Sequence, residues 1–383
     1  MVATATKPRP EFNAGLELAK CRYYHLVPKD RMSNVVYRTR LIRAATGNRE
    51  MQHALWKACS QDILFFFNAF GFTLNPKDTD EPTPCLPFIT YHYQDEAILH
   101  ILWCIQNGRD LAIPKSREMG VSWMVLMVYT WLFIFFPLQA FLLVSRKEDL
   151  VDKTGDYDSL MAKIDFALER LPRWMVPRIE RNNLHMKNLE NSSTIDGEST
   201  NGDVSRGGRK RSIFFDEYAA VPNGFEILTA SRDSTRCRIW GSTHKGARTA
   251  FYDVVTKTKC DKMPLHWTLH PKKRQGLYHD ANGKPRSPWY DEEVGRCAHP
   301  MEVAQELDMD VLASDYVFFS PQLLDRLRAE TVQPATLAGD LDFDPESLQP
   351  LKFVAREGGP LRLWIHLDGE GTPPASTTSR EWT

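Results

Sequence analysis

Two adjacent carboxylates, Asp216 and Glu217, are the side chains of this sequence best placed to do chemistry. They follow the apolar run Ser212–Phe215, which has the composition of a buried strand. Charges at the end of a buried strand are costly unless they bind something, and ligands of parallel sheets gather at that end. The first carboxylate can hold Mg²⁺, and the second can accept a proton from an attacking water. The alternative is a strand-ending turn with two solvated acids.

A second group of polar residues lies in the loop that follows an earlier apolar run. A standard phosphate-binding loop reads Gly-x-x-x-x-Gly-Lys-Ser/Thr, and Gly120 and Ser122 fit that pattern. Val121 stands where the lysine is usual, and Lys115 takes the place of the first glycine. The chemistry is still supplied, because backbone N–H groups near Gly120 can cradle phosphate, Ser122 can bind Mg²⁺ and Lys115 can reach the β- and γ-phosphates. The predicted nucleotide-binding residues of this loop are Lys115, Ser116, Arg117, Glu118, Met119, Gly120, Val121 and Ser122. An ordinary strand-to-helix turn is the alternative.

Small polar residues also follow a third apolar run, Arg238–Trp240. They are Gly241, Ser242 and Thr243. Two hydroxyl groups at another strand end can sense a γ-phosphate, although small polar residues end many strands. The triplet therefore gains meaning only beside the other two groups.

The loop 201–211 is rich in glycine and positive charge. It holds three glycines and four basic residues, Arg206, Arg209, Lys210 and Arg211. Such a segment can contact DNA phosphates or the nucleotide of a neighbouring subunit. A solvated hairpin is the alternative.

Alternating strands and helices must position these groups. Strands are predicted at Leu111–Ile113, Ala140–Val144, Ile213–Phe215 and Arg238–Trp240, and helices at 50–70, 94–106, 121–136, 148–170 and 300–312. This alternation predicts a parallel α/β sheet. Residues 1–50 are polar and basic, and they predict a mobile arm with a short helical start.

Composition and charge exclude several classes of protein. The chain has 383 residues, and its 48 basic and 49 acidic residues rule out binding to nucleic acid through bulk positive charge. Seven cysteines without a Cys-x-x-Cys pair indicate neither a zinc site nor a disulfide framework, so we expect reduced thiols in a cytosolic protein. The N-terminus has no apolar secretory segment.

One apolar stretch has the length of a membrane span. The run Val121–Val144 contains no charged residue. Pro137 splits it and Gln139 follows, so we interpret it as a buried helix followed by a buried strand.

Taken together, the motifs resemble the large terminase subunit of tailed bacteriophages, the motor that packs DNA into capsids. The similarity runs from about residue 88 to 320, with the motifs in the family's order. The matching segments are Tyr91–Gln94 (a glutamine that reads adenine), Lys115–Trp123 (a deviant phosphate loop with an early lysine), Ile213–Glu217 (a Walker B strand with the catalytic glutamate), Gly241–Thr243 (the coupling motif), and Ser287–Tyr290 with Ala304–Glu306 (the lid).

The resemblance implies a fold and a set of roles. The fold is α/β, a P-loop NTPase core of the ASCE or RecA-like type, with a mostly parallel sheet flanked by helices and a small lid subdomain. ATP and Mg²⁺ are the implied cofactors, with Gln94 at the adenine, Ser122 and Asp216 at the metal, and Glu217 as the catalytic base.

Two arginines receive catalytic roles from the same resemblance. Arg117 matches an arginine that contacts the γ-phosphate in cis, and Arg206 matches a proposed arginine finger that acts in trans. Arg209 and Arg211 lie near enough to compete for the second role, and with Lys210 they are the predicted DNA contacts.

The resemblance and the composition together predict four segments. They are an N-terminal arm with helices (1–60), the ATPase core (61–255), the lid subdomain (256–330) and a linker (331–383). The family also carries a C-terminal nuclease of ribonuclease H type, whose acidic cluster is not recognisable among Asp342, Asp344 and Asp368. We therefore expect the nuclease to be absent from this chain, which would be the ATPase part of a longer protein.

The predicted function is an ATPase motor domain of a viral terminase that couples hydrolysis to translocation of double-stranded DNA into a procapsid, in the cytoplasm of the bacterial host. The implied partners are the portal protein, the small terminase subunit and further copies of the chain in a ring, with a monomer in isolation and no membrane. The alternatives are a helicase-like or other DNA-remodelling P-loop ATPase, and a binding module with an inactive ATP site. DNA unwinding would favour the first of these, and nucleotide binding without turnover the second.

Overall fold

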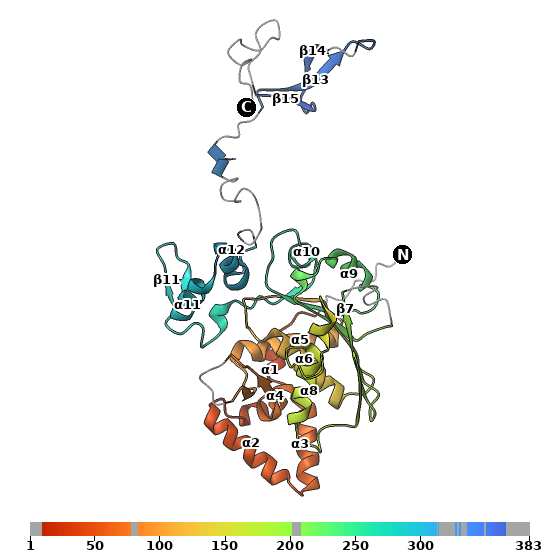
Figure 1. Ribbon diagram of the computed structural model, residues 1–383, viewed down its shortest axis with the longest axis vertical. Helices are drawn as coiled ribbons and strands as arrows, with labels where there is room; N and C mark the ends of the chain where they lie inside the picture. The colour runs from red at the N-terminus through yellow and green to blue at the C-terminus, as the bar shows by residue number, and fades with distance from the viewer. Residues whose placement is uncertain are drawn as a thin grey trace, which may run out of the picture. The chain divides into compact units, whose positions relative to one another are not determined.

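The computed structural model describes residues 10–77, 83–200, 208–311, 313, 326–327, 329–330, 335–347 and 350–364. The chain divides into two compact units, Met1–Tyr316 and Val317–Thr383. All of the predicted site residues belong to the first unit, which contains the large sheet and most of the helices (Figure 1).

Among the described residues, eight strands form one sheet in the first unit. Its order is β10-β3-β9-β8-β4-β7-β6-β5, parallel from β10 to β7 and antiparallel from β7 to β5. The strands are β3 (Leu111–Pro114), β4 (Ala140–Ser145), β5 (Ile179–Asn182), β6 (His185–Asn188), β7 (Thr194–Ser199), β8 (Ser212–Asp216), β9 (Arg238–Ser242) and β10 (Asp261–Lys262). The expected α/β fold with a mostly parallel sheet is confirmed, as are the four strands that the sequence predicted.

Helices cover both faces of this sheet, because the strand residues that point to either face are apolar. Phe141 and Leu143 of β4 pack into one core layer, whereas Leu142 and Val144 pack into the other. The first layer is covered by α5 (His92–Asn107), α6 (Val121–Phe135) and α8 (Leu160–Arg170), and the second by α9 (Gly224–Ala230) and α10 (Ala250–Lys257). Helices α5 and α6 lie side by side (Figure 1).

The long apolar run consists of α6 and β4, as the sequence analysis interpreted it. Nearly every residue of α6 is buried, which explains its composition. None of the described helices is both long and apolar enough to cross a membrane.

The segment 148–170 was predicted as one helix, and this was wrong. It forms α7 (Glu148–Val151) and α8, separated by a turn in which Gly155 has a φ of 78°. A residue in the left-handed region cannot continue a right-handed helix, so the chain breaks there.

The N-terminal segment is more ordered than the predicted mobile arm. It forms α1 (Ala14–Leu18), the 3₁₀ turn η1 (Tyr24–Leu26), α2 (Arg31–Ala45), α3 (Arg49–Gln61) and α4 (Ile63–Phe70), followed by the hairpin strands β1 (Phe72–Leu74) and β2 (Cys85–Pro87). Helix α2 was not predicted, because its buried residues include Asn34 and Arg38, while Met32 is 74% exposed. Without an apolar stripe, helical periodicity gives no signal.

Beyond the sheet, the first unit ends in a small subdomain with its own core of Trp267, Tyr290, Val303 and Leu307. Its elements are η3 (Trp267–Leu269), β11 (Tyr278–His279), β12 (Pro285–Arg286), α11 (Pro288–Arg296), α12 (Pro300–Val303) and the π-helical turn η4 (Ala304–Asp308). The expected start of this lid subdomain at residue 256 was too early, because β10 still pairs with β3 in the central sheet. A two-residue edge strand leaves no readable pattern.

The second unit contains an antiparallel sheet where a linker was predicted. Strands β13 (Leu337–Phe343), β14 (Pro350–Ala355) and β15 (Leu361–Leu363) are ordered β14-β13-β15. Arg356 pairs with Asp340 at 2.5 Å beside the β13–β14 pairing. The segment predicted as a linker, 331–383, thus contains three paired strands between 337 and 363, and the compact unit that holds them begins at Val317. Strand β13 buries only Gly339 and β15 buries none of its residues, so neither shows the apolar alternation that marks a buried strand.

We expect Asp62→Ala to destabilise the first unit strongly. The buried Asp62 carboxylate accepts hydrogen bonds from the backbone N–H groups of Phe65, Tyr23 and Tyr24 at 2.9, 2.7 and 2.8 Å. Removing it leaves these donors without a partner, at a cost of about 2–4 kcal/mol in the free energy of unfolding. Urea denaturation measures the change. The control is Asp30→Ala, which removes the exposed cap of α2 and should cost clearly less; equal losses would contradict the prediction.

Candidate active site

The loop between β3 and α6 has the backbone geometry of an anion-binding turn. Gly120 precedes α6 with a φ of 80°, and a Cβ added there would lie 3.0 Å from Nε2 of Gln94. Both facts require glycine at this position. The N–H groups of the first turn of α6 have no partners within the helix, so the loop presents donors to an anion.

Lys115 leaves the end of β3 and points across the sheet to Glu217. Its Nζ lies 2.7 Å from Oε1 of Glu217, and its side chain is only 9% exposed. The backbone N–H of Lys115 donates to the carbonyl of Ser242 at 3.1 Å, which fixes the start of the loop on β9. The early lysine is therefore at the same edge as the paired carboxylates.

Asp216 and Ser122, the two predicted magnesium ligands, are in direct contact. The hydroxyl of Ser122 donates to Oδ1 of Asp216 at 2.8 Å. Burial, followed by the neighbouring charge of Glu217, raises the pKa of Asp216 to about 6, while the ammonium groups of Lys115 and Lys163 oppose this rise. A carboxylate and a hydroxyl oxygen are suitable donors for Mg²⁺, so these residues fit that ion.

Glu217 occupies a strained backbone position. Its φ of 50° lies in the left-handed region, and the chain turns there from β8 into the 3₁₀ turn η2 (Tyr218–Ala220). For a glutamate this conformation costs about 1–2 kcal/mol. Its side chain is 40% exposed, so one oxygen can bind Lys115 while the group remains open to water.

The triplet Gly241–Thr243 lies between the other two groups because β9 is inserted between β3 and β8. A Cβ on Gly241 would come within 3.0 Å of Val121, so β9 approaches the start of α6 closely. The hydroxyl of Ser242 accepts a hydrogen bond from the N–H of Ala219 at 3.1 Å and lies 3.5 Å from Oε2 of Glu217. Thr243 is buried.

Gln94 lies against the same loop from α5. Its Oε1 accepts from the N–H of Tyr91 at 3.0 Å, which caps the helix and points its amide nitrogen toward Gly120. The hydroxyl of Tyr93 donates to the carbonyl of Met119 at 3.1 Å. Tyr91 contacts the ring of His270 from the lid subdomain, with 4.8 Å between ring centroids.

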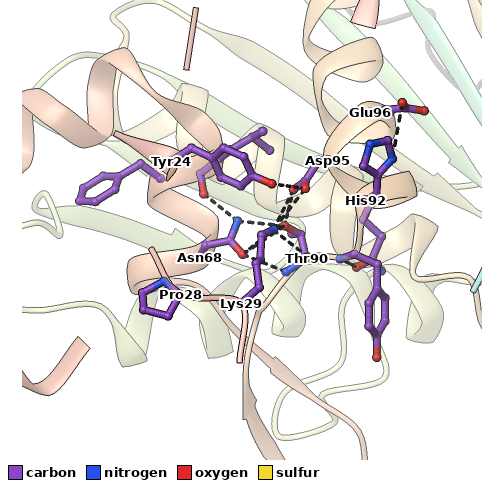
Figure 2. A network of polar contacts seen from close by, with 12 residues as sticks. Tyr24, Pro28, Lys29, Asn68, Thr90, His92, Asp95 and Glu96 are labelled. Atoms are coloured by element: carbon purple, nitrogen blue, oxygen red, sulfur yellow. Dashed lines mark hydrogen bonds and ion pairs between the residues drawn. The ribbon is translucent and has the colours of Figure 1, made fainter. Parts of the chain in front are cut away.

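A polar network anchors this end of α5 to the N-terminal helices (Figure 2). Asp95 accepts from the hydroxyl of Tyr24 at 2.5 Å and from Nζ of Lys29 at 3.2 Å, and it also contacts the hydroxyl of Thr90. The amide of Asn68 donates to Thr90 at 2.9 Å. A cavity of about 550 Å³ beside this network is lined by Tyr24, Lys29, Tyr91, His92, Asp95 and Lys272, among others. Lys29 and Asp95 were not predicted from the sequence. Lys29 lies in the segment that was predicted to be a mobile arm, so no fixed contact was expected for it.

The lid subdomain forms hydrogen bonds with Ser116 and Arg117 of the loop between β3 and α6. Ser116, predicted to bind nucleotide, is fully buried instead: its hydroxyl donates to the carbonyl of Leu307 at 2.6 Å and accepts from the N–H of Trp267 at 3.0 Å. The carbonyl of Arg117 accepts from Nζ of Lys273 at 2.5 Å. Burial lowers the pKa of Lys273 to about 8. Lys273 was missed because a lysine in irregular sequence carries no positional signal.

Two residues of the loop are exposed. Arg117 extends into solvent, and Glu118 pairs with Lys77 at 2.7 Å. The geometry thus brings together Lys115, Ser122, Asp216, Glu217 and Ser242, while the side chains of Ser116, Arg117 and Glu118 point elsewhere.

The basic loop contributes less free charge than the sequence indicated. Lys210 is 13% exposed and pairs with Asp196 at 2.5 Å, so part of its charge is used within the chain, and its assignment as a DNA contact stays a prediction. Arg209 and Arg211 are exposed. Arg206 lies outside the described residues.

Lys163 on α8 is a cation near the site that the sequence analysis missed. Its charge and that of Asp216 affect each other, and burial is the main cause that lowers its pKa. On an amphipathic helix a lysine is usually assigned to the solvent face, which is why sequence reasoning did not single it out.

No protein-family model and no curated protein matches the chain. Among solved structures, the large terminase ATPase domain of Thermus phage P74-26 is 14% identical with a TM-score of 0.37, over 55% of this chain and 93% of that chain. The large terminase of bacteriophage HK97 is 12% identical with a TM-score of 0.47, over 66% of this chain and 55% of that one. The large terminase of a thermophilic bacteriophage, in complex with ADP, is 13% identical with a TM-score of 0.42, over 58% of this chain and 54% of that one. The motifs of the sequence resemble those of the same family.

We expect Asp216→Asn to raise the melting temperature of the metal-free chain at pH values above about 6. The raised pKa means that the folded state holds this proton more tightly than the unfolded chain, so ionisation costs stability as the pH rises from about 4 to about 6. Removing the charge should add about 1 kcal/mol, or roughly 2–4 °C in Tm.

Differential scanning calorimetry at pH of about 5 and of about 8 tests this prediction. The gain should be larger at the higher pH. The control is Ser122→Ala, which keeps the carboxylate but removes its hydrogen bond, and should lower Tm. A gain that is the same at both pH values would contradict the assigned cause.

Proposed function

We propose that this chain is an ATP-hydrolysing motor domain of the terminase type. One observation carries the proposal: Lys115, Ser122, Asp216 and Glu217 converge where three adjacent parallel strands end and α6 begins. Ligands of open α/β sheets bind at this edge. A lysine, a hydroxyl, two carboxylates and a helix N-terminus are the groups that phosphoryl transfer requires.

Each group has a task that follows from its position. The first turn of α6 binds phosphate oxygens, and Ser122 with Asp216 would hold Mg²⁺. The ion would neutralise charge on the phosphates. The exposed carboxylate of Glu217 is placed to orient a water and accept its proton.

The ion pair between Lys115 and Glu217 suggests how the site is kept inactive when empty. While the lysine donates to Oε1 of the glutamate, that oxygen is occupied and is not open to a water. A triphosphate competes for the same ammonium group, because it carries more negative charge than one carboxylate. Binding of the substrate would then release Glu217 for catalysis.

The partners and the cargo are part of the proposal. Double-stranded DNA is the proposed cargo, with Arg209 and Arg211 as exposed contacts and the portal protein and small terminase subunit as partners. Subunits in a ring would share active sites through Arg206. Support comes from the motif order along the chain and from the exposed arginines after β7.

The proposal also includes the absence of nuclease activity. In the second unit Asp340 pairs with Arg356, and Asp344 accepts hydrogen bonds from the N–H groups of Glu346 and Ser347. Two-metal hydrolysis needs carboxylates that converge on ions about 4 Å apart. The carboxylates of Asp340 and Asp344 are instead used locally, so we expect no metal-dependent nicking of supercoiled plasmid.

We expect Glu217→Gln to bind ATP and lose turnover by about 10²-fold or more, because an amide cannot accept the proton.

Lys115→Ala should weaken ATP binding as well as turnover, and adding Val121→Lys should restore part of both. Fluorescent nucleotide binding and phosphate release, with DNA present, measure the two quantities.

The matched control for these variants is Glu226→Gln, an exposed glutamate on α9. It should leave both quantities unchanged. Normal turnover in Glu217→Gln would exclude the glutamate as the base, and DNA unwinding by the native chain would support the helicase alternative.

We expect a mixture of Arg206→Ala and Glu217→Gln chains to recover part of the activity that each lacks alone. A finger supplied in trans contributes about 10³-fold or more, and mixed interfaces pair an intact finger with an intact base. In the control mixture, Arg209→Ala takes the place of Arg206→Ala. Mixing Arg209→Ala with Glu217→Gln should not raise turnover above that of the two chains measured separately. No recovery, with weaker DNA binding in Arg206→Ala, would make Arg206 a phosphate contact.

A further inference from the structure

Helix α5 and the edge strand β10 bring three metal-ligating side chains together outside the candidate active site. His100 and Cys104 lie one helical turn apart and so share a face of α5. Asp261 reaches them from β10. One ligand atom of each residue lies within 4.8 Å of the other two, and Sγ of Cys104 is 4.0 Å from Oδ2 of Asp261.

The imidazole of His100 is held in place by two aromatic side chains. Its ring stacks on Phe12 with 4.1 Å between centroids and contacts the edge of Trp103. Its buried Nε2 has no hydrogen-bond partner among the described residues. Buried polar atoms are normally satisfied, so an orphan nitrogen in a cluster of metal ligands calls for an occupant.

The chemistry of the cluster limits what that occupant can be. Imidazole nitrogen, thiolate sulfur and carboxylate oxygen are together the ligands of Zn²⁺, whereas Mg²⁺ prefers oxygen alone. At zinc bond lengths of about 2.0–2.3 Å the ligand atoms must close to roughly 3.3–3.8 Å, a shift within reach of side-chain rotation.

A neighbouring arginine orients the third ligand. Nε and Nη2 of Arg109 lie 2.9 and 3.1 Å from the two oxygens of Asp261. Each carboxylate oxygen keeps a second lone pair, and ligating carboxylates are commonly held by such hydrogen bonds.

We propose that His100, Cys104 and Asp261 bind one zinc-like divalent cation, with water in the fourth position. The ion joins α5, whose first turn carries Gln94, to β10, whose continuation pairs at Leu265 with Lys115. The sequence indicated no zinc site, because it contains no Cys-x-x-Cys pair. Cys104 and Asp261 are 157 positions apart, so only the fold brings them together.

Cobalt binding to the full chain tests the site. The tag-free protein, stripped with EDTA and kept reduced with a phosphine, is titrated with Co²⁺ in the presence of excess Mg²⁺, which is added to compete with Co²⁺ for Asp216. We expect one Co²⁺ per chain, a thiolate-to-cobalt absorption band in the near ultraviolet, and loss of that band when Zn²⁺ is added. Zn²⁺ should also raise Tm.

Three variants decide whether these residues are the ligands. His100→Phe keeps a ring between Phe12 and Trp103 but removes both nitrogens, and Cys104→Ala removes the thiol. Each should abolish the cobalt band and the Zn²⁺-dependent rise in Tm, while Cys59→Ala, at another buried cysteine, should keep both. If His100→Phe does not fold, Cys104→Ala alone decides. Absence of the band in the native chain, or its persistence in Cys104→Ala, overturns the proposal.

Discussion

Two neighbouring carboxylates at the end of one buried strand are the constraint around which the first unit is built. Asp216 and Glu217 repel each other, and burial makes the charge of Asp216 still more costly. Groups from three other elements stabilise these charges: Lys115 from the end of β3, Ser122 from the start of α6 and Lys163 from α8. Each of these elements must therefore be held in place by contacts that are not themselves catalytic.

Helix α5 provides many of those contacts. At its N-terminus it is tied to the N-terminal helices by the pairing of Asp95 with Tyr24 and Lys29. The two residues before Asp95, Gln94 and Tyr93, contact the loop between β3 and α6. The lid subdomain holds the opposite side of that loop through Ser116. The loop is thus fixed from two sides by residues far away in the sequence.

The sequence predicted four of the eight strands of the large sheet, β3, β4, β8 and β9, because these are short apolar runs bounded by polar residues. It did not predict β5, β6, β7 or β10. It also found the two groups that form the candidate site, since a strand followed by Asp-Glu and a loop with Gly120 and Ser122 are local patterns. Local patterns do not predict which residues a side chain contacts in the folded protein. The lid contacts of Ser116, the ion pair of Lys210 with Asp196 and the approach of Lys163 to Asp216 all depend on residues distant in sequence.

The remaining errors have a common physical origin. Helix α2 lacks an apolar stripe, β13 buries only Gly339, and β15 buries none of its residues, so these elements do not give the burial signal on which periodicity depends. Strand β10 is too short to show any alternation. Elements that are stabilised by pairing or polar contacts rather than by apolar burial remain invisible to a single sequence.

The insertion of β9 between β3 and β8 has a mechanical consequence. Neighbouring strands lie about 4.8 Å apart, so the ends of β3 and β8 are separated by roughly 10 Å, enough for a phosphate and a water. Ser242 bridges that gap, because its carbonyl holds the backbone of Lys115 and its hydroxyl holds the turn after Glu217. A displacement of this one residue along its strand would move the cation and the carboxylate together. The spacing of these two strand ends is thereby set by the sheet, and Ser242 connects both of them to β9.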